Sequence, residues 1–433
     1  MINVSIRPLH RAWWVAFAAF FALLGAAGFR AAPGVLIEPL HAEFGWARST
    51  ISAAVSVNLL LYGLTAPFAA ALMERFGMRR VAGCALLVVA LGAGGTVFMT
   101  ASWQLVLCWG ILVGLGTGSM AMSFAAMVTS RWFVRHHGVV TGVLTAAGAT
   151  GQLIFLPVVA HVATGYGWRT ASLVIAGAAL LVVPLVLGLI RNHPADVHTT
   201  PYGAEASEPV AAPTPTGGSA KRALSVLRSA ARTRTFWLLA IGFAICGATT
   251  NGLVNTHFVP AAHDHGMPQT TAASLLAVIG IFDVVGTVAS GWLTDRVDPR
   301  WLLGGYYTLR GGSLLLLPEL LGNAVQPSMW AFIVFYGLDW VATVPPTVAL
   351  CRRHFGMAGP IAFGWVFASH QIGAGFAAVG AGFVRDQLGS YQLAWYIAGG
   401  LAMVAAICSV RIRTPEREQE IRESRDHADT DAA

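Results

Sequence analysis

Long apolar runs dominate this 433-residue chain and restrict its fold more than any other feature. A helix needs roughly 20 apolar residues to cross about 30 Å of hydrocarbon. Only 11% of the residues are charged, against about a quarter in soluble domains. We therefore predict an all-α membrane protein with twelve transmembrane helices. The runs that are long enough lie at 12–37, 49–72, 80–100, 104–130, 138–163, 169–190, 235–259, 271–294, 301–322, 328–350, 359–384 and 390–410.

Basic residues mark the loops of one side. If the N-terminus is inside, 22 of the 27 lysines and arginines fall on that side, and three (Arg48, Arg169 and Arg385) fall on the other. Basic loops stay in the cytoplasm, so we expect a multi-pass protein of the cell inner (plasma) membrane with both termini cytoplasmic. The net charge of +7 is spread over many short loops. This spread favours membrane lipid as the partner and argues against nucleic acid.

The composition changes between residues 192 and 233, where Pro, Ala, Thr and Gly predominate. Such a stretch is typical of a flexible connector, because it offers little apolar surface to bury. We predict a six-helix bundle at 1–191, a cytoplasmic linker at 192–233, a second six-helix bundle at 234–413 and a cytoplasmic tail at 414–433.

The two halves repeat one another at an offset of 221 residues. The matching pairs include Pro39 and Pro260, Gly45 and Gly266, Glu74 and Asp295, Arg75 and Arg296, Arg79 and Arg300, and Arg131 and Arg352. Repeats in the same orientation are known in transporters, where the substrate site lies near the bilayer midplane between the halves.

The paired loops ALMERFGMRR (71–80) and GWLTDRVDPR (291–300) resemble the loop motif of the major facilitator superfamily. The resemblance implies two pseudo-symmetric six-helix bundles and a cytoplasmic gate. Physically, the loop carboxylate can face the N-terminus of a neighbouring helix while the arginines stay with lipid headgroups. The alternative is that these charges only set the topology. The candidate gate residues are Glu74, Arg75, Arg79, Asp295, Arg296 and Arg300.

Within that superfamily, RWFVRHHGVVTGVLTAAG (131–148) resembles the fifth-helix motif of the monocarboxylate-porter branch, which includes oxalate/formate antiporters. The membrane aspartate of the branch matches Asp283, although Thr287 stands where an arginine is usual. His370 matches the eleventh-helix cation of the oxalate-type members. The resemblance implies transport of a small organic anion.

Arg30 lies well inside the first apolar run, where an ionisable group is expensive and therefore a functional candidate. Its planar guanidinium matches a carboxylate, and the repeat places Asn251 opposite it. We expect Arg30 and Asn251 to bind substrate. The alternative is that Arg30 pairs with Glu38 or extends to the interface.

Three more charges lie at midmembrane depth: Asp283, Arg310 and Asp339. Arg310 and Asp339 sit on successive antiparallel helices and can form a structural ion pair. Alternatively, Arg310 reaches Asp283 and makes a network that loads and releases a proton. An aspartate that moves between apolar and arginine-paired surroundings can carry a proton, and we expect Asp283 to do so.

Polar residues on the other spans complete the predicted site. His370 could contribute a cation or titrate near neutrality, or it could be a hydrogen-bonded core histidine. The substrate-binding candidates besides Arg30 and Asn251 are His370, Gln371, Asn58, Tyr62, Gln152, Asn255 and His257.

Motifs of other classes are missing. The single lysine, Lys221, does not lie in a P-loop, and neither HExxH nor GxSxG occurs. We expect no enzymatic activity, no cofactor and no metal. The prediction is a monomeric secondary transporter of mono- or dicarboxylates, proton-coupled, working by rocker-switch alternating access. A proton-coupled drug or metabolite efflux antiporter and a transporter-like nutrient sensor are the alternatives.

Overall fold

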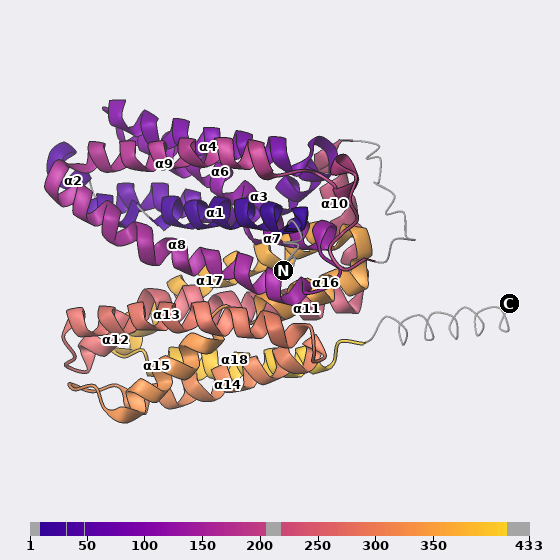
Figure 1. The fold of residues 1–433 in the computed structure, drawn as a ribbon. Helices are drawn as coiled ribbons and strands as arrows, with labels where there is room; N and C mark the ends of the chain where they lie inside the picture. The colour runs from indigo at the N-terminus through magenta and orange to yellow at the C-terminus, as the bar shows by residue number, and fades with distance from the viewer. Residues whose placement is uncertain (1–8, 32, 47, 205–217, 414–433) are drawn as a thin grey trace, which may run out of the picture.

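Two bundles of helices lie side by side in the computed structural model (Figure 1), which describes residues 9–31, 33–46, 48–204 and 218–413. The first bundle contains α1 (Arg11–Ala31), α2 (Pro33–Phe44), α3 (Arg48–Phe76), α4 (Met78–Gly95), η1 (Thr96–Phe98), α5 (Ser102–Leu105), η2 (Val106–Val113), α6 (Gly114–Ser119), α7 (Met122–Trp132), α8 (His137–Tyr166) and α9 (Trp168–Leu189). The connection contains η3 (Pro194–Val197) and α10 (Ser219–Ala230). The second bundle contains α11 (Arg234–Gly247), η4 (Ala248–Val254), α12 (Asn255–Asp264), α13 (Gln269–Thr294), α14 (Pro299–Leu320), α15 (Pro327–Asp339), α16 (Val344–Phe355), η5 (Gly356–Ala358), α17 (Gly359–Leu388) and α18 (Gln392–Val410).

Single helices, or runs of consecutive helices, make stretches that are long and apolar enough to cross a membrane. In the part of the chain that the structure describes, ten stretches meet this requirement. One of them, Pro327–Leu388, has 62 residues, about three times the length of one crossing, and contains α15, α16 and α17. The 22-residue α14 is not among the ten. The all-α membrane fold is therefore confirmed.

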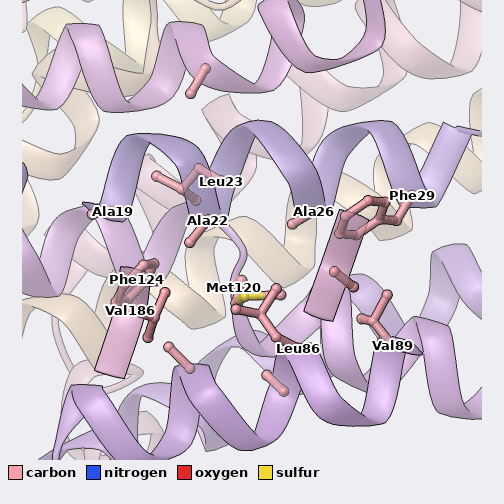
Figure 2. Close-up of a cluster of buried hydrophobic side chains, with 14 of the residues drawn as sticks. Ala19, Ala22, Leu23, Ala26, Phe29, Leu86, Val89, Met120, Phe124 and Val186 are labelled. Atoms are coloured by element: carbon pink, nitrogen blue, oxygen red, sulfur yellow. The ribbon is translucent and has the colours of Figure 1, made fainter. Parts of the chain in front are cut away.

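Small residues allow α1 to pack closely in the first bundle. Ala19, Ala22, Leu23 and Ala26 are buried and recur at helical spacing, so they form one face. Figure 2 shows this face of α1 with side chains from the helices around it. The residues it faces include Leu86, Val89, Met120, Phe124 and Val186. Alanine faces of this kind let membrane helices approach closely.

The two bundles meet where α8 crosses α13 and where α3 crosses α17. A Cβ atom at Gly291 of α13 would collide with the carbonyl oxygen of Gly138 on α8. A Cβ atom at Gly364 of α17 would lie 2.7 Å from the Cα of Pro67 on α3. Both crossings therefore require residues without side chains.

Two spans are broken at equivalent places. α6 ends at Ser119 and α7 begins at Met122, while α15 ends at Asp339 and α16 begins at Val344. The offset of 221 carries the first break onto the second. The sequence predicted continuous helices at 104–130 and 328–350, so this is a correction. Pro345 and Pro346 explain the second break in part, because proline lacks an N–H group and suits the first turn of a helix.

The connection between the bundles is structured, so the expectation of a flexible linker is wrong for its described parts. α10 buries Ala223 and Val226, because its apolar positions form one face. Tyr202 is half-buried among other rings, and its ring lies edge-on to that of Trp13 with 5.5 Å between the centroids. We call the end of the molecule where α10 lies the linker end; it is on the right in Figure 1. The predicted tail at 414–433 lies outside the described residues.

Candidate functional site

Arg30 lies in the last turn of α1, and α2 begins three positions later, at Pro33. Its side chain, like that of Glu38, lies outside what the structure describes. The adjacent Phe29 is buried and its ring lies 5.6 Å from that of Phe155 on α8. A Cβ atom at Gly28 would also collide with Phe155. The end of α1 that carries Arg30 is thus placed beside α8.

Asn251, the partner of Arg30 in the repeat, lies within η4, a π-helical turn. The residue is half-buried, and its backbone carbonyl accepts a hydrogen bond from the Thr256 hydroxyl at 2.9 Å. π-helical turns are rare and frequently occur at functional sites. A second one, η2, lies in the first bundle.

Three of the candidates come together where α3 crosses α17. Tyr62 of α3 lies edge-on to Phe367 of α17, with 5.5 Å between ring centroids. The His370 ring stacks on the same Phe367 at 5.9 Å. The side chain of Gln371 covers Gly63 of α3. Tyr62, His370 and Gln371 therefore belong to one contact between the bundles.

The other four polar candidates lie on α3, α8 and α12. Asn58 is fully buried and its Nδ2 donates to the Trp109 carbonyl at 2.8 Å, which joins α3 to η2. The His257 Nε2 lies 2.8 Å from the Ala378 carbonyl oxygen, which joins α12 to α17. Gln152 is half-buried on α8, and Asn255 is exposed on α12. Asn58 and His257 therefore hold helices together in this conformation.

Arg310 and Asp339 form the ion pair that the sequence favoured. The Arg310 Nε donates to the Asp339 carboxylate at 2.6 Å, and both side chains are buried. Nη2 donates to the backbone carbonyls of Asp339 at 2.7 Å and Trp340 at 3.1 Å. Nη1 lies 2.9 Å from the Cys246 sulfur. The guanidinium is thus bonded on all three of its nitrogens.

Asp283 binds the break between α15 and α16. Its Oδ1 accepts hydrogen bonds from the Thr287 hydroxyl at 2.9 Å and from the Val341 backbone N–H at 3.1 Å. The Ser290 hydroxyl donates to the Ala342 carbonyl at 2.5 Å. Backbone groups freed inside a membrane need such partners. Asp283, Ser290 and Arg310 together supply these partners. The sequence did not point to Ser290, nor to Cys246, whose sulfur contacts Arg310.

The two motif carboxylates at the linker end have different partners. Asp295 of the second bundle accepts from the backbone N–H groups of Gly138 at 2.7 Å and Val139 at 3.1 Å, at the start of α8. A helix N-terminus stabilises a negative charge. Glu74 of the first bundle instead pairs with Arg222 of α10 at 3.1 Å. Both contacts lie at the linker end.

The motif arginines contact nearby groups. The Arg75 guanidinium lies over the Phe76 ring at 5.0 Å, and the Arg79 backbone N–H donates to Asn192 at 3.2 Å. Arg296 donates to the Trp292 carbonyl at 3.0 Å. Arg300 pairs with Asp298 at 2.6 Å, and this guanidinium holds the pKa of the Asp298 carboxyl below its usual value.

Comparisons with known proteins agree on one family. The family model described as Major Facilitator Superfamily matches residues 15–359 and 243–431. Monocarboxylate transporter 13 of Bos taurus is 28% identical over 408 residues, which cover 91% of this chain and 87% of that protein. The MFS-type transporter YcxA of Bacillus subtilis is 26% identical over 398 residues, covering 88% of this chain and 90% of YcxA.

Solved structures have the same fold at lower identity. The proton:xylose symporter XylE aligns with a TM-score of 0.68 and 14% identity over 93% of this chain and 96% of its own. The human organic anion transporter MFSD10 aligns with a TM-score of 0.67 and 13% identity over 93% of this chain and 100% of its own.

Proposed function

Because this chain belongs to the major facilitator superfamily, with relatives named monocarboxylate transporters, we propose that it is a secondary active transporter of small organic anions. The substrate class is mono- or dicarboxylates, coupled to protons. The cycle is a rocker switch, in which the two bundles tilt about a central site and open it to each side in turn. The two bundles and their repeated broken spans support a cycle of this kind.

The environment of Arg310 carries the proposal for the substrate. Each nitrogen of that guanidinium already has a partner within the protein, so Arg310 is not available to a passenger. Arg30 is then the arginine within the spans that we assign to the substrate carboxylate, since its fork can donate two parallel hydrogen bonds.

We assign Asn251, His370, Gln371 and Tyr62 to the same site, with Gln152 and Asn255 at its margins. Tyr62, His370 and Gln371 lie at one crossing of the two bundles, where a rocking motion would change their surroundings. Asn58 and His257 would act indirectly, by holding their helices.

We assign the coupling proton to Asp283. Its carboxylate is bonded by a hydroxyl and a backbone N–H, whereas Asp339 is bonded by a guanidinium. An adjacent arginine favours the ionised form of a carboxylate, so Asp339 would stay charged while Asp283 takes up and releases the proton.

The linker end would face the cytoplasm, because basic loops gather there. Asp295 and Glu74, with their loop arginines, would then form the cytoplasmic gate. The contacts of Asp295 with α8 and of Arg352 with the Phe133 carbonyl at 3.4 Å join the bundles at that end. The conformation described here would therefore be closed to the cytoplasm.

Uptake by proteoliposomes tests the proposal. Labelled monocarboxylates, dicarboxylates and aromatic acids are offered with and without a pH gradient. Arg30→Ala and Arg30→Lys should each lower uptake by at least roughly tenfold, because a charge-assisted hydrogen bond is lost. Arg169→Lys is the matched control, since Arg169 forms an exposed pair with Glu43, and its uptake should stay near that of the parent protein.

Asp283→Asn separates binding from proton coupling. An asparagine oxygen can still accept the Val341 N–H, so the break should persist, and exchange of labelled for unlabelled anion should continue without a response to the pH gradient. Normal uptake by both Arg30 variants would contradict the substrate site. Binding without uptake in the parent protein would identify a sensor instead.

A further inference from the structure

The connecting helix α10 is bonded to one helix of each bundle. Its Arg222 Nε donates to Glu74 of α3 at 3.1 Å. The carbonyl oxygen of Ala223, the next residue, accepts from the Trp365 indole N–H of α17 at 3.0 Å. The side chains of Ala223 and Val226, on the apolar face of α10, are buried. α10 therefore spans the seam between the two bundles at the linker end (Figure 1).

The internal repeat explains why the first bundle needs this helix. Asp295 is held by the backbone N–H groups of Gly138 and Val139. The offset of 221 carries these two donors to Gly359 and Pro360, where α17 begins. Proline has no N–H group, so the donor pair that Glu74 would meet by symmetry is incomplete. Arg222 donates to Glu74 in its place.

We propose that Arg222 is a positioning residue of the transport cycle, which replaces the incomplete helix N-terminus and so holds the linker end closed. α3 and α17 must separate when this end opens. α10 can then keep its contact with Glu74 or its contact with Trp365, but not both. Loss of one contact would therefore favour the open state. The inference rests on the alternating-access cycle proposed above, although not on its substrate.

Distances between spin labels at the linker end test this inference in the full-length protein. Cysteines replace Arg80 at the start of α4 and Val297 after α13, which are both exposed. Alanine replaces Cys84, Cys108 and Cys408, whereas Cys246 and Cys351 are buried and can stay. A closed linker end gives a single short distance, and an open one adds a longer distance.

Arg222→Glu should raise the ratio of the long to the short population by roughly two- to fivefold, the range expected for a partly exposed ion pair. Glu74→Arg should act in the same direction. The exchange of both, Glu74→Arg with Arg222→Glu, should return the ratio toward that of the parent protein. Arg228→Glu makes the same charge change on an exposed position of α10 and should leave the ratio unchanged.

Trp365→Phe tests the other contact, because it removes the N–H donor to Ala223. It keeps an aromatic ring against Phe68, whose ring centroid lies 5.5 Å from that of Trp365 in the parent protein. It should also raise the long population. Unchanged distances in both Arg222→Glu and Trp365→Phe would overturn the inference, and so would an exchange variant that opens further. These measurements need no substrate, so a failed uptake assay would leave them standing.

Discussion

Arg310 shows how a charge can be kept inside an apolar bundle without serving a substrate. Its side chain is fully buried, and its bonds run to Asp339, to Cys246 and to two carbonyls of the broken span. A buried charge is tolerated when its partners replace the lost water. This residue therefore holds α14 against the break, and its depth in the membrane follows from the depth of that break.

Arg310→Met should lower the free energy of unfolding by roughly 3–5 kcal/mol, because it leaves the other partner of a buried ion pair as an unpaired charge. The substitution leaves the Asp339 carboxylate and the Trp340 carbonyl without their donor. Thermal unfolding in detergent measures the loss. The double variant Arg310→Met with Asp339→Leu should recover part of it, because no unpaired carboxylate remains.

Arg385→Met is the control for this experiment, since Arg385 forms a partly exposed pair with Asp264. Its loss should be within about 1 kcal/mol. If Arg310→Met is as mild as Arg385→Met, the buried pair does not hold the break.

The sequence allowed the Arg310–Asp339 pair to be predicted, because both residues lie at similar depth on neighbouring antiparallel spans. It did not allow the carbonyl bonds of Arg310 or the Val341 bond of Asp283 to be predicted. These bonds depend on a break in the helix, and Trp340, Val341 and Ala342 are as apolar as the helices on each side. Hydropathy therefore continues through the break and hides it.

At the scale of elements, α10 illustrates a second limit. The composition of residues 192–233 predicted a flexible connector, because that average includes many prolines, glycines and threonines. The average conceals twelve residues of amphipathic helix, Ser219–Ala230, whose apolar face finds a partner on the bundles. The span positions were predictable because each apolar run is long. The docking of α10 was not, because its partner surface exists only after both bundles fold.

The short helix α2 is attached to α9 through Glu43. This carboxylate accepts from the Trp168 indole at 2.6 Å and from Arg169 at 2.9 Å. The Trp168 hydrogen bond, followed by that of Arg169, lowers the pKa of Glu43 below 4.5. A carboxyl whose folded pKa is lowered contributes stability above its unfolded pKa. That contribution is lost as the pH falls below about 4.5 and through the folded pKa.

Glu43→Gln should remove this pH dependence. In the parent protein, amide hydrogen exchange at residues 39–46, corrected for its intrinsic pH dependence, should become faster relative to α9 as the pH falls from 6 toward 4. The effect should be a few-fold at most, because the pair is partly exposed. The variant should exchange equally fast across this range. A parent protein that shows no change would mean that Phe44 and Leu40 alone hold α2.

At the scale of the whole molecule, the two bundles touch through seams of small residues. Gly138 and Gly142 of α8 face Gly291 of α13, and Gly364 of α17 faces Pro67 of α3. The bonds from Asp295, Arg222 and Arg352 lie at the same end. The seams let the backbones close against one another, and the polar bonds then hold them there. A cycle that opens this end must break the bonds of Asp295 and Arg352 and one of the two contacts of α10.

Gly291→Ala should therefore shift the molecule toward the state that is open at the linker end. The new Cβ would collide with the Gly138 carbonyl oxygen and would lie 2.9 Å from the Gly142 Cα, and both contacts are with backbone, which cannot move aside as a side chain can. The Arg80–Val297 label pair should report a larger long-distance population than in the parent protein.

Gly305→Ala is the matched control, because a Cβ atom there meets nothing within 4 Å. It should leave the distances unchanged and stabilise α14 by up to about 1 kcal/mol, the difference in helix propensity. The clash at Gly291 is relieved only when α8 and α13 separate. If Gly291→Ala leaves both the label distances and the uptake as in the parent protein, the bundles do not close along this seam during transport.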